Sequence, residues 1–159
     1  MELHRLIEHA LEFAARGWPV MPTNGKRPIY SPWLSNATAT TDPDTIRRYW
    51  TEHPTANIAM ATGEASGIIV VDLDVRPGRN IDGIRAWNRE IDTLASTSAR
   101  GGLHLFYRWR KEIGTRLEPA RGIDIWSDRG SVTLPPSTVQ GVRYEWLNDL
   151  PIADYPTGT

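Results

Sequence analysis

A run of five residues from Gly67 to Val71 constrains the fold of this chain more than any other feature. The run is apolar throughout, so both faces of a strand formed here are expected to be buried. It is followed at once by Asp72 and Asp74, with one leucine between them. The pattern therefore predicts a central strand over 67–74 that ends in two carboxylates, which need a positive partner because like charges repel.

Length and composition limit the remaining possibilities. The 159 residues suffice for one compact domain, and the absence of cysteine excludes disulfides, cysteine-ligated zinc and thiol catalysis. No apolar run could span a membrane and no signal peptide is evident, so we expect a cytoplasmic protein without membrane contact. The net charge of −1 does not by itself indicate nucleic-acid binding, although residues 97–143 carry eight basic against four acidic residues. This local excess of basic residues is consistent either with binding of a polyanion or with an ordinary solvent-exposed surface.

The order of predicted elements indicates an α+β fold with helices covering one face of a sheet. Helices are expected over residues 1–18, 41–53 and Ile81–Leu94, the second with Thr41 or Asp42 as its N-cap. Strands are expected over residues 17–22, 57–63, 67–74, 102–109, 122–126, 131–137 and 142–147. The tryptophans expected in the core are Trp18, Trp50, Trp87 and Trp146. Residues 151–159 are interpreted as a tail or the start of a linker.

The two strand-end carboxylates suit a divalent-cation site. Residues two apart on a strand share a face and lie about 6–7 Å apart, so Asp72 and Asp74 can share two cations roughly 3.5–4 Å apart. Oxygen ligands favour Mg²⁺ or Mn²⁺. The same Asp-x-Asp pattern also occurs in haloacid-dehalogenase-type phosphatases, in sugar-nucleotide transferases and by chance at strand ends.

A second cluster lies in "STSARGGLHLFYR", Ser96 to Arg108. Its glycines expose backbone N–H groups, and Ser98 and Arg100 add donors, so this loop is suited to phosphate. His104 follows on the predicted strand, where a histidine is either a satisfied structural residue or a phosphate contact. The adjoining loop favours the phosphate contact.

The third cluster is "GIDIWSDRG", Gly122 to Gly130. Asp124 stands between two isoleucines, which is an unfavourable place for an unpaired charge and makes it a candidate third metal ligand. Asp128 is interpreted as a turn residue. Trp126 shares the strand face of Asp124 and is the one tryptophan that we weigh as a border of a nucleotide or template strand.

Taken in order, these motifs resemble a known family. The series "KRP", "SGIIVVDLD", "TSARGGLHLFY", "GIDIW" and "LPPS" is similar to the bifunctional primase–polymerase domains of the archaeo-eukaryotic primase superfamily. The resemblance runs from about Ala10 to Trp146, and such domains occur in plasmid, phage and prophage replication proteins. The "TSARGGLH" loop is also similar to the "TSGGKGLH"-type loop of ligase-associated repair polymerases.

The resemblance implies an RRM-like mixed or antiparallel sheet as catalytic core, covered by helices and joined to an N-terminal αβ unit within residues 1–150. It implies a DNA polymerase/primase that uses two Mg²⁺ or Mn²⁺ ions to add nucleoside triphosphates, dNTP or rNTP, to a 3′-hydroxyl. The partners would be a DNA template and primer, with a helicase or helical domain in a longer replication protein. The setting would be a bacterial cytoplasm and a phage, prophage or plasmid gene.

The resemblance also assigns residues. Those that match the family's metal ligands are Asp72, Asp74 and Asp124. Those that match its triphosphate-binding segment are Ser98, Arg100, Gly102 and His104. Lys26, in the "KRP" stretch, is assigned to a substrate phosphate. Gly102 stands where the family often has serine, a departure that bears on the role of Ser98.

Two other classes of protein remain as alternatives. A haloacid-dehalogenase-type phosphatase would carry its aspartate motif near the chain start, followed by a lysine and a further acidic pair, whereas here only Lys111 follows and no Asp–Asp pair exists. A non-catalytic RRM-like nucleic-acid-binding module would not need three carboxylates, and its aromatic strand signature is absent. An inactive member of the primase–polymerase family is the third reading.

Overall fold

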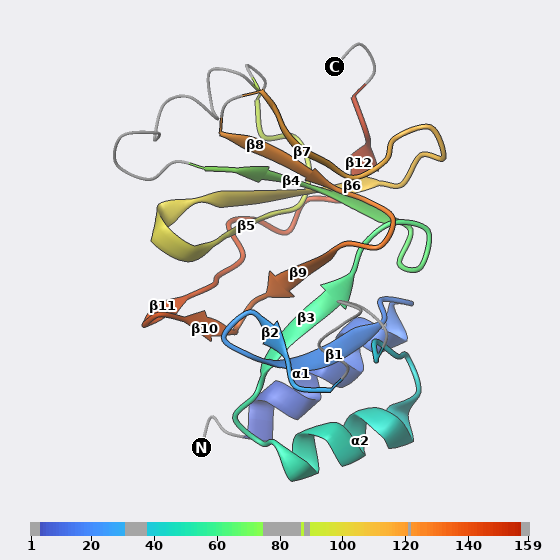
Figure 1. Ribbon diagram of the computed structural model, residues 1–159, viewed down its shortest axis with the longest axis vertical. Helices are drawn as coiled ribbons and strands as arrows, with labels where there is room; N and C mark the ends of the chain where they lie inside the picture. The colour runs from blue at the N-terminus through green and yellow to red at the C-terminus, as the bar shows by residue number, and fades with distance from the viewer. Residues whose placement is uncertain (1–3, 31–37, 75–86, 88–89, 121, 157–159) are drawn as a thin grey trace.

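The computed structural model describes residues 4–30, 38–74, 87, 90–120 and 122–156. Over these residues the chain forms two α-helices and three mostly antiparallel sheets, which confirms the predicted α+β class (Figure 1). The helices are α1 (His4–Ala15) and α2 (Pro43–Glu52), and a 3₁₀ turn covers Ala99–Gly101. The strands are β1 (Val20–Asn24), β2 (Arg27–Pro28), β3 (Asn57–Ala61), β4 (Ile68–Leu73), β5 (Ala95–Thr97), β6 (Leu103–Arg108), β7 (Arg116–Ala120), β8 (Ile123–Trp126), β9 (Ser131–Leu134), β10 (Thr138–Val139), β11 (Val142–Arg143) and β12 (Ala153–Asp154).

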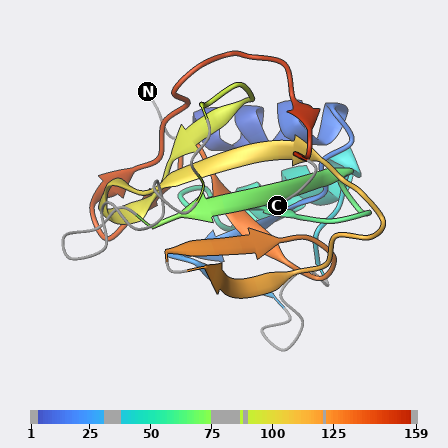
Figure 2. The ribbon, with the colours of Figure 1, turned by 90° about the horizontal axis from the view of Figure 1, so that it is seen from above.

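The elements are arranged in layers. The upper sheet has the strand order β12-β6-β4-β8-β7, with β5 paired to β6, and the lower sheet has the order β2-β1-β3-β9. In Figure 1 the upper sheet lies above the lower sheet, and both helices lie at the opposite end of the molecule from the upper sheet. Strands β10 and β11 form a separate hairpin. Figure 2, seen from above, shows the long strands of the upper sheet running side by side.

Strand β4 has the central place in the upper sheet that its sequence predicts, because it pairs with β6 on one side and with β8 on the other. Val70 on one face packs into the core shared with the lower sheet and the helices. Ile69 and Val71 on the other face join a second core that includes Trp87 and Tyr155. An apolar run with no polar alternation is what burial on both faces requires.

Local signals set the start of α2. The N-cap is Asp42, whose Oδ2 accepts a hydrogen bond from the Thr45 backbone N–H at 3.0 Å, and a proline occupies the first turn. The face of α2 that carries Ile46, Tyr49 and Trp50 is buried, as the helical spacing predicts.

Aromatic rings connect the helices to the upper sheet. Phe13 of α1 stacks on Trp18 with ring centroids 5.7 Å apart, and Trp18 in turn stacks on Phe106 of β6 at 6.0 Å. Trp50 and Trp87 are buried, and Trp146 is partly buried against the same core as Phe106. The four tryptophans predicted to be core residues are therefore confirmed.

The helix predicted over Ile81–Leu94 is wrong at its C-terminal end. Residues 90–94 are not helical, and the Ile91 side chain is 41% exposed instead of lying on a buried face. The Leu94 carbonyl accepts the backbone N–H of Phe106 at 2.9 Å, so pairing beside β6 has replaced the local helical bond. Of residues 81–89, all but Trp87 lie outside the described residues.

The last part of the chain is paired with the upper sheet. The short strand β12 runs parallel to β6, and the Arg108 Nε donates to Asp154 Oδ1 at 2.7 Å. Tyr155 is buried and makes an edge contact with Tyr107, with ring centroids 5.7 Å apart. No helix within the described ranges is long and apolar enough to cross a membrane.

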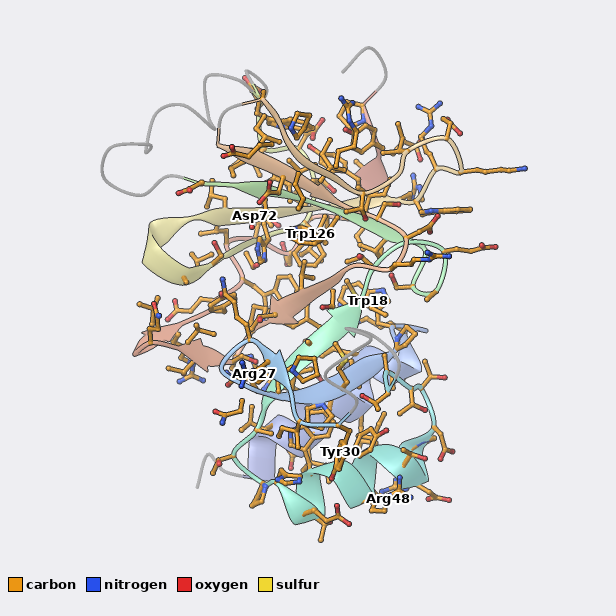
Figure 3. All side chains as sticks on the ribbon, in the orientation of Figure 1. Trp18, Arg27, Tyr30, Arg48, Asp72 and Trp126 are labelled. Carbon is orange, nitrogen blue, oxygen red and sulfur yellow. The ribbon has the colours of Figure 1, made fainter. Side chains whose placement is uncertain are left out.

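Tyr30 links the end of β2 to the end of α2, beside which it lies in Figure 3. Its hydroxyl donates to Glu52 Oε1 at 2.6 Å, and its ring stacks on Tyr49 with centroids 4.9 Å apart. The hydrogen bond to Glu52 raises the pKa of Tyr30 from 10.0 to about 12, with burial and the Glu52 charge adding to the effect. The fold therefore favours the neutral phenol, whose stabilising effect is complete below pH 10.0 and is lost as the pH rises to about 12.

We expect Tyr30→Phe to keep the ring stack and to lower the free energy of unfolding at pH 8 by about 0.5–1.5 kcal/mol, because one hydrogen bond is lost. Absorbance titration at 295 nm should show that the variant lacks one phenol titrating near pH 12. Urea unfolding of both proteins measures the stability difference. If the phenol that is missing from the variant titrates near pH 10 instead of near pH 12, the assignment is contradicted.

Candidate active site

Three polar side chains meet on neighbouring strands of the upper sheet. Asp72 of β4 lies directly opposite His104 of β6 on one side and Asp124 of β8 on the other. Directly paired residues of antiparallel strands share a face, so these side chains form one row across the sheet. Asp74 comes just after β4, where its backbone N–H donates to the Gly122 carbonyl at 2.7 Å. The structure thus brings residues from three separate sequence motifs together.

The row continues a face that is apolar two residues earlier along β4. There Val70 pairs with Phe106 and with Trp126, and all three contact the core shared with the lower sheet. At Asp72 the same face becomes polar and lines a cleft. Figure 3 shows Asp72 on the upper sheet and Arg27 on the β1–β2 hairpin of the lower layer. The polar row therefore marks the place where the sheet face passes from core to cleft.

His104 is held firmly between a charge and an aromatic ring. Its side chain is only 7% exposed, and its Nε2 lies 3.6 Å from Asp72 Oδ2. Its ring makes an edge contact with Tyr144, with centroids 6.0 Å apart. The buried Nδ1 has no hydrogen-bond partner among the described residues. The sequence reasoning missed Tyr144, which it placed only within a strand.

Tyr144 also touches the loop after β5. Burial raises the pKa of its phenol, and the nearby backbone N–H of Ala99 opposes this effect. Among the described residues the phenol oxygen has no hydrogen-bond partner, so its interaction with the Ala99 N–H is a longer-range electrostatic one. Tyr144 therefore packs beneath both His104 and the loop that precedes it.

Asp124 carries an excess of negative charge around it. Its Oδ1 accepts the Glu118 backbone N–H at 2.8 Å, which favours the ionised carboxylate. Burial nevertheless raises the pKa of Asp124 above 3.8, and the charges of Asp72, Glu118 and Asp74 raise it further. The ionised carboxylate is thus disfavoured in the fold, and a nearby positive charge would relieve this cost.

The Asp124→Asn substitution tests this crowding. The raised pKa means that the folded state holds its proton more tightly, so stability falls as the pH rises from 3.8 through the folded pKa. The amide keeps an oxygen that can accept the Glu118 N–H and removes the charge. We expect the melting temperature of the variant at pH 7 to equal or exceed that of the parent. The difference between the two melting temperatures should disappear as the pH falls to 3.8 and below, where Asp124 of the parent is protonated. Exposed Asp149→Asn is the control, and a lower melting temperature for Asp124→Asn alone would contradict the expectation.

The loop that precedes β6 packs closely around Gly102. The Ser98 backbone N–H donates to the Gly102 carbonyl at 2.8 Å, across the turn Ala99–Gly101. A Cβ at position 102 would collide with Ser98 Oγ and lie 3.1 Å from the Leu73 carbonyl. Glycine is therefore the residue that lets Ser98 occupy this space. The side chain of Arg100 lies outside the described part of the structure.

The candidate residues whose positions are described line one cleft of about 530 Å³. The carboxylates and His104 come from the upper sheet, Ser98 and Gly102 from the loop, and Lys26 from the β1–β2 hairpin. The remaining lining residues are Gly25, Ala99, Val139 and Gln140. Gln140 was not expected from the sequence; it and Gly141 form a two-residue turn between Val139 and Val142, in which both have positive φ, 52° and 78°.

Two other sequence expectations concern neighbouring residues. Trp126 does not line the cleft but lines a smaller chamber of about 100 Å³, which shares Lys26, Asp72 and His104 with it. Its contact with nucleotide or template therefore stays a prediction. Asp128 lies in a turn, as its sequence context predicts, but its Oδ1 accepts the backbone N–H of Glu64, far away in the sequence, at 2.9 Å.

The donor set fits a hard divalent cation. Asp72 and Asp124 are direct neighbours across two strands, and both offer oxygen ligands. Within the described ranges, no three histidine or acidic side chains are gathered into a complete metal-binding group. Mg²⁺ commonly takes only one or two carboxylates and completes its coordination with water and substrate phosphates. The residues therefore fit a cation that binds together with a phosphate-bearing substrate.

Fold and cleft together define a class of protein. Carboxylates at adjacent strand positions, facing a lysine and a glycine-containing loop across one cleft, are suited to phosphoryl or nucleotidyl transfer assisted by divalent cations. The same arrangement offers no cysteine nucleophile, since the chain has no cysteine.

The comparison with protein families is specific. Residues 10–158 match the Prim-Pol family, described as bifunctional DNA primase/polymerase, N-terminal, and the chain belongs to this family. Membership implies a DNA primase/polymerase enzyme with DNA and nucleotide substrates, of a kind that typically needs divalent metals. A search of curated proteins found no match.

Proposed function

We propose that this chain is a template-directed nucleotidyltransferase that adds nucleoside triphosphates to a 3′-hydroxyl during DNA replication. The observation that carries the proposal is the row formed by His104, Asp72 and Asp124, opening on a cleft of about 530 Å³. Clefts of this size hold small-molecule ligands. Family membership supports the reaction class.

In this proposal Asp72, Asp74 and Asp124 hold two divalent cations, Mg²⁺ or Mn²⁺. Bound there, the cations would lower the pKa of the attacking hydroxyl and shield the leaving oxygens. The raised pKa of Asp124 supports the assignment, because it reflects burial and the nearby negative charges of Asp72, Glu118 and Asp74, and a bound cation would be attracted to these charges. The chain itself thus supplies oxygen ligands and holds them in register.

The triphosphate would lie in the same cleft, beside the carboxylates. Ser98 and the backbone of the turn before Gly102 supply donors, His104 and Lys26 supply further contacts, and Arg100 completes the set. The primer 3′-hydroxyl would lose its proton to water as its oxygen attacks the α-phosphorus; the bond to the bridging oxygen would break, and pyrophosphate would leave with that electron pair. The fold has mainly to position the reactants and to neutralise charge that develops on the phosphates.

The wider setting follows the same proposal. The upper sheet, mainly antiparallel with β4 at its centre, supports the interpretation of an RRM-like core, with residues 1–150 as one catalytic domain. Its partners would be template, primer and dNTP or rNTP, together with a helicase or helical domain in a longer protein. A bacterial cytoplasm and a phage, prophage or plasmid origin agree with this use.

The test is extension of a labelled primer on a DNA template with dNTPs, in Mg²⁺ or Mn²⁺ and again with excess chelator. Metal-dependent extension that copies the template supports the proposal. DNA binding without any extension in either metal would overturn it and favour the non-catalytic nucleic-acid-binding module. Replacing dNTPs by rNTPs, and then omitting the primer, defines nucleotide choice and priming.

A further inference from the structure

Two hairpins that are far apart in the sequence form adjoining parts of the cleft rim. The turn between β1 and β2 contributes Gly25 and Lys26, and the turn between β10 and β11 contributes Gln140. The second turn is tight, since Val139 pairs directly with Val142. Both turns therefore contribute residues to the cleft that the carboxylates also line.

One side chain is bonded to both hairpins. Asn57, the first residue of β3, donates from Nδ2 to the Gly25 carbonyl at 3.1 Å and to the Thr138 carbonyl at 2.7 Å. Its Oδ1 accepts the Thr138 backbone N–H at 3.1 Å. Gly25 directly precedes Lys26, and Thr138 directly precedes Val139. Three hydrogen bonds thus join the two parts of the rim through one amide group.

The environment of Asn57 makes this bridge rigid. The residue is only 8% exposed, so an unmade hydrogen bond here would not be replaced freely by water. The Gly25 carbonyl also accepts the Thr23 hydroxyl at 2.8 Å, which fixes the turn from its own strand. Ser137 Oγ accepts the Ile58 backbone N–H at 2.8 Å, which anchors the β9–β10 connection to β3 but does not reach the β1–β2 turn.

We propose that Asn57 is a positioning residue that sets the distance between the β1–β2 and β10–β11 hairpins and so holds Lys26 over the nucleotide cleft. The part of this inference that concerns nucleotide rests on the proposed function. Loss of the bridge should leave the carboxylate row intact, because that row belongs to the upper sheet. It should therefore weaken nucleotide binding more than the chemical step.

The chain offers a matched control in Asn148. Its Oδ1 accepts the backbone N–H groups of Ala95 and Leu150 at 3.3 and 3.2 Å, and its Nδ2 donates to the Thr93 carbonyl at 3.2 Å. Asn148 also makes three side-chain bonds to backbone, yet it does not line the cleft. Replacing it by alanine measures what the loss of such a bridge does elsewhere in the fold.

The first measurement is a distance. Because the chain has no cysteine, Arg27→Cys and Val142→Cys, both at exposed positions, can be spin-labelled selectively and their separation measured by pulsed electron resonance. We expect Asn57→Ala to broaden or lengthen the distance distribution and Asn148→Ala to leave it unchanged. An unchanged distribution in Asn57→Ala, or an equal change in both variants, overturns the inference. Asn57→Asp, which has the same shape but lacks both N–H donors, serves if the alanine variant does not fold.

The second measurement is kinetic. In primer extension, Asn57→Ala should raise the KM for dNTP on the order of tenfold while kcat changes less than about threefold, because ground-state binding is what it loses. Asn148→Ala should leave both constants near those of the parent. A fall in kcat with an unchanged KM would overturn the positioning role. If the parent protein extends no primer, the proposed function fails, and the distance measurement still decides the structural inference.

Discussion

Asp72→Asn is expected to lower the rate of primer extension by about a thousandfold, the scale of losing a group that stabilises transition-state charge. Asp72 stands between His104 and Asp124 in the cross-strand row, and in the proposed mechanism it is a ligand of the divalent cations. The amide has nearly the same shape but is a much poorer ligand for a divalent cation. Extension at saturating Mg²⁺ and at saturating Mn²⁺ gives the measurement.

The same substitution should not destabilise the fold. The charge of Asp72 is one cause of the raised pKa of Asp124, so removing it should bring that pKa closer to its ordinary value. Thermal unfolding at pH 7 should show an equal or higher melting temperature. Asp154→Asn is the control, since this exposed residue pairs with Arg108 at the sheet edge and its loss should matter little. If Asp72→Asn keeps more than about a tenth of the parent rate, transition-state stabilisation by this carboxylate is refuted.

Gly102→Ala is expected to lower kcat/KM for nucleotide addition on the order of a hundredfold, as small misplacements of positioning groups do. The added Cβ would collide with Ser98 Oγ and crowd the Leu73 carbonyl at 3.1 Å. Relief of the clash requires the Ser98 hydroxyl to rotate away or the turn that Ser98 closes with Gly102 to shift, and the carbonyl belongs to the strand that carries Asp72. The substitution therefore disturbs both the loop and the end of β4.

Gly114→Ala provides the control for Gly102→Ala. A Cβ at position 114 would meet nothing within 4 Å, and this residue does not line the cleft. Its activity and melting temperature should match those of the parent. The Gly102 variant should also lose about 1–3 kcal/mol of stability through overpacking. Full activity of Gly102→Ala would mean that the loop adapts without cost and that Ser98 is not needed where it lies.

The fold was predictable where local pattern and burial agree. The apolar run before Asp72 forms a strand whose two faces must both be buried, and β4 is central in the upper sheet for that reason. The start of α2 was predictable because Asp42 and the proline after it act within one turn. The helix predicted to end at Leu94 was wrong there because this segment pairs beside β6, a partner that local periodicity does not reveal.

The residue types that form the candidate site were predictable from the sequence. The chemical role of each of these residues remains a prediction. Carboxylates at the end of an apolar strand and a glycine loop before a histidine are conspicuous in the sequence, and the structure places them on one cleft. Tyr144, Gln140 and Asn57 carry no such signal. Each contributes through contacts with segments tens of residues away in the chain.

By itself, the sequence determined the α+β class, the central strand and the chemical character of the cleft, because these follow from hydrophobic burial and from which side chains can bind cations and phosphates. The tertiary structure alone decided that Asp72 lies between His104 and Asp124, that Gly102 leaves room for Ser98, and that Asn57 joins two hairpins. The physical reason is strand register. Which residues face one another across a sheet depends on the packing of the whole chain, and a shift of β4 by one residue would turn Asp72 to the other face of the upper sheet.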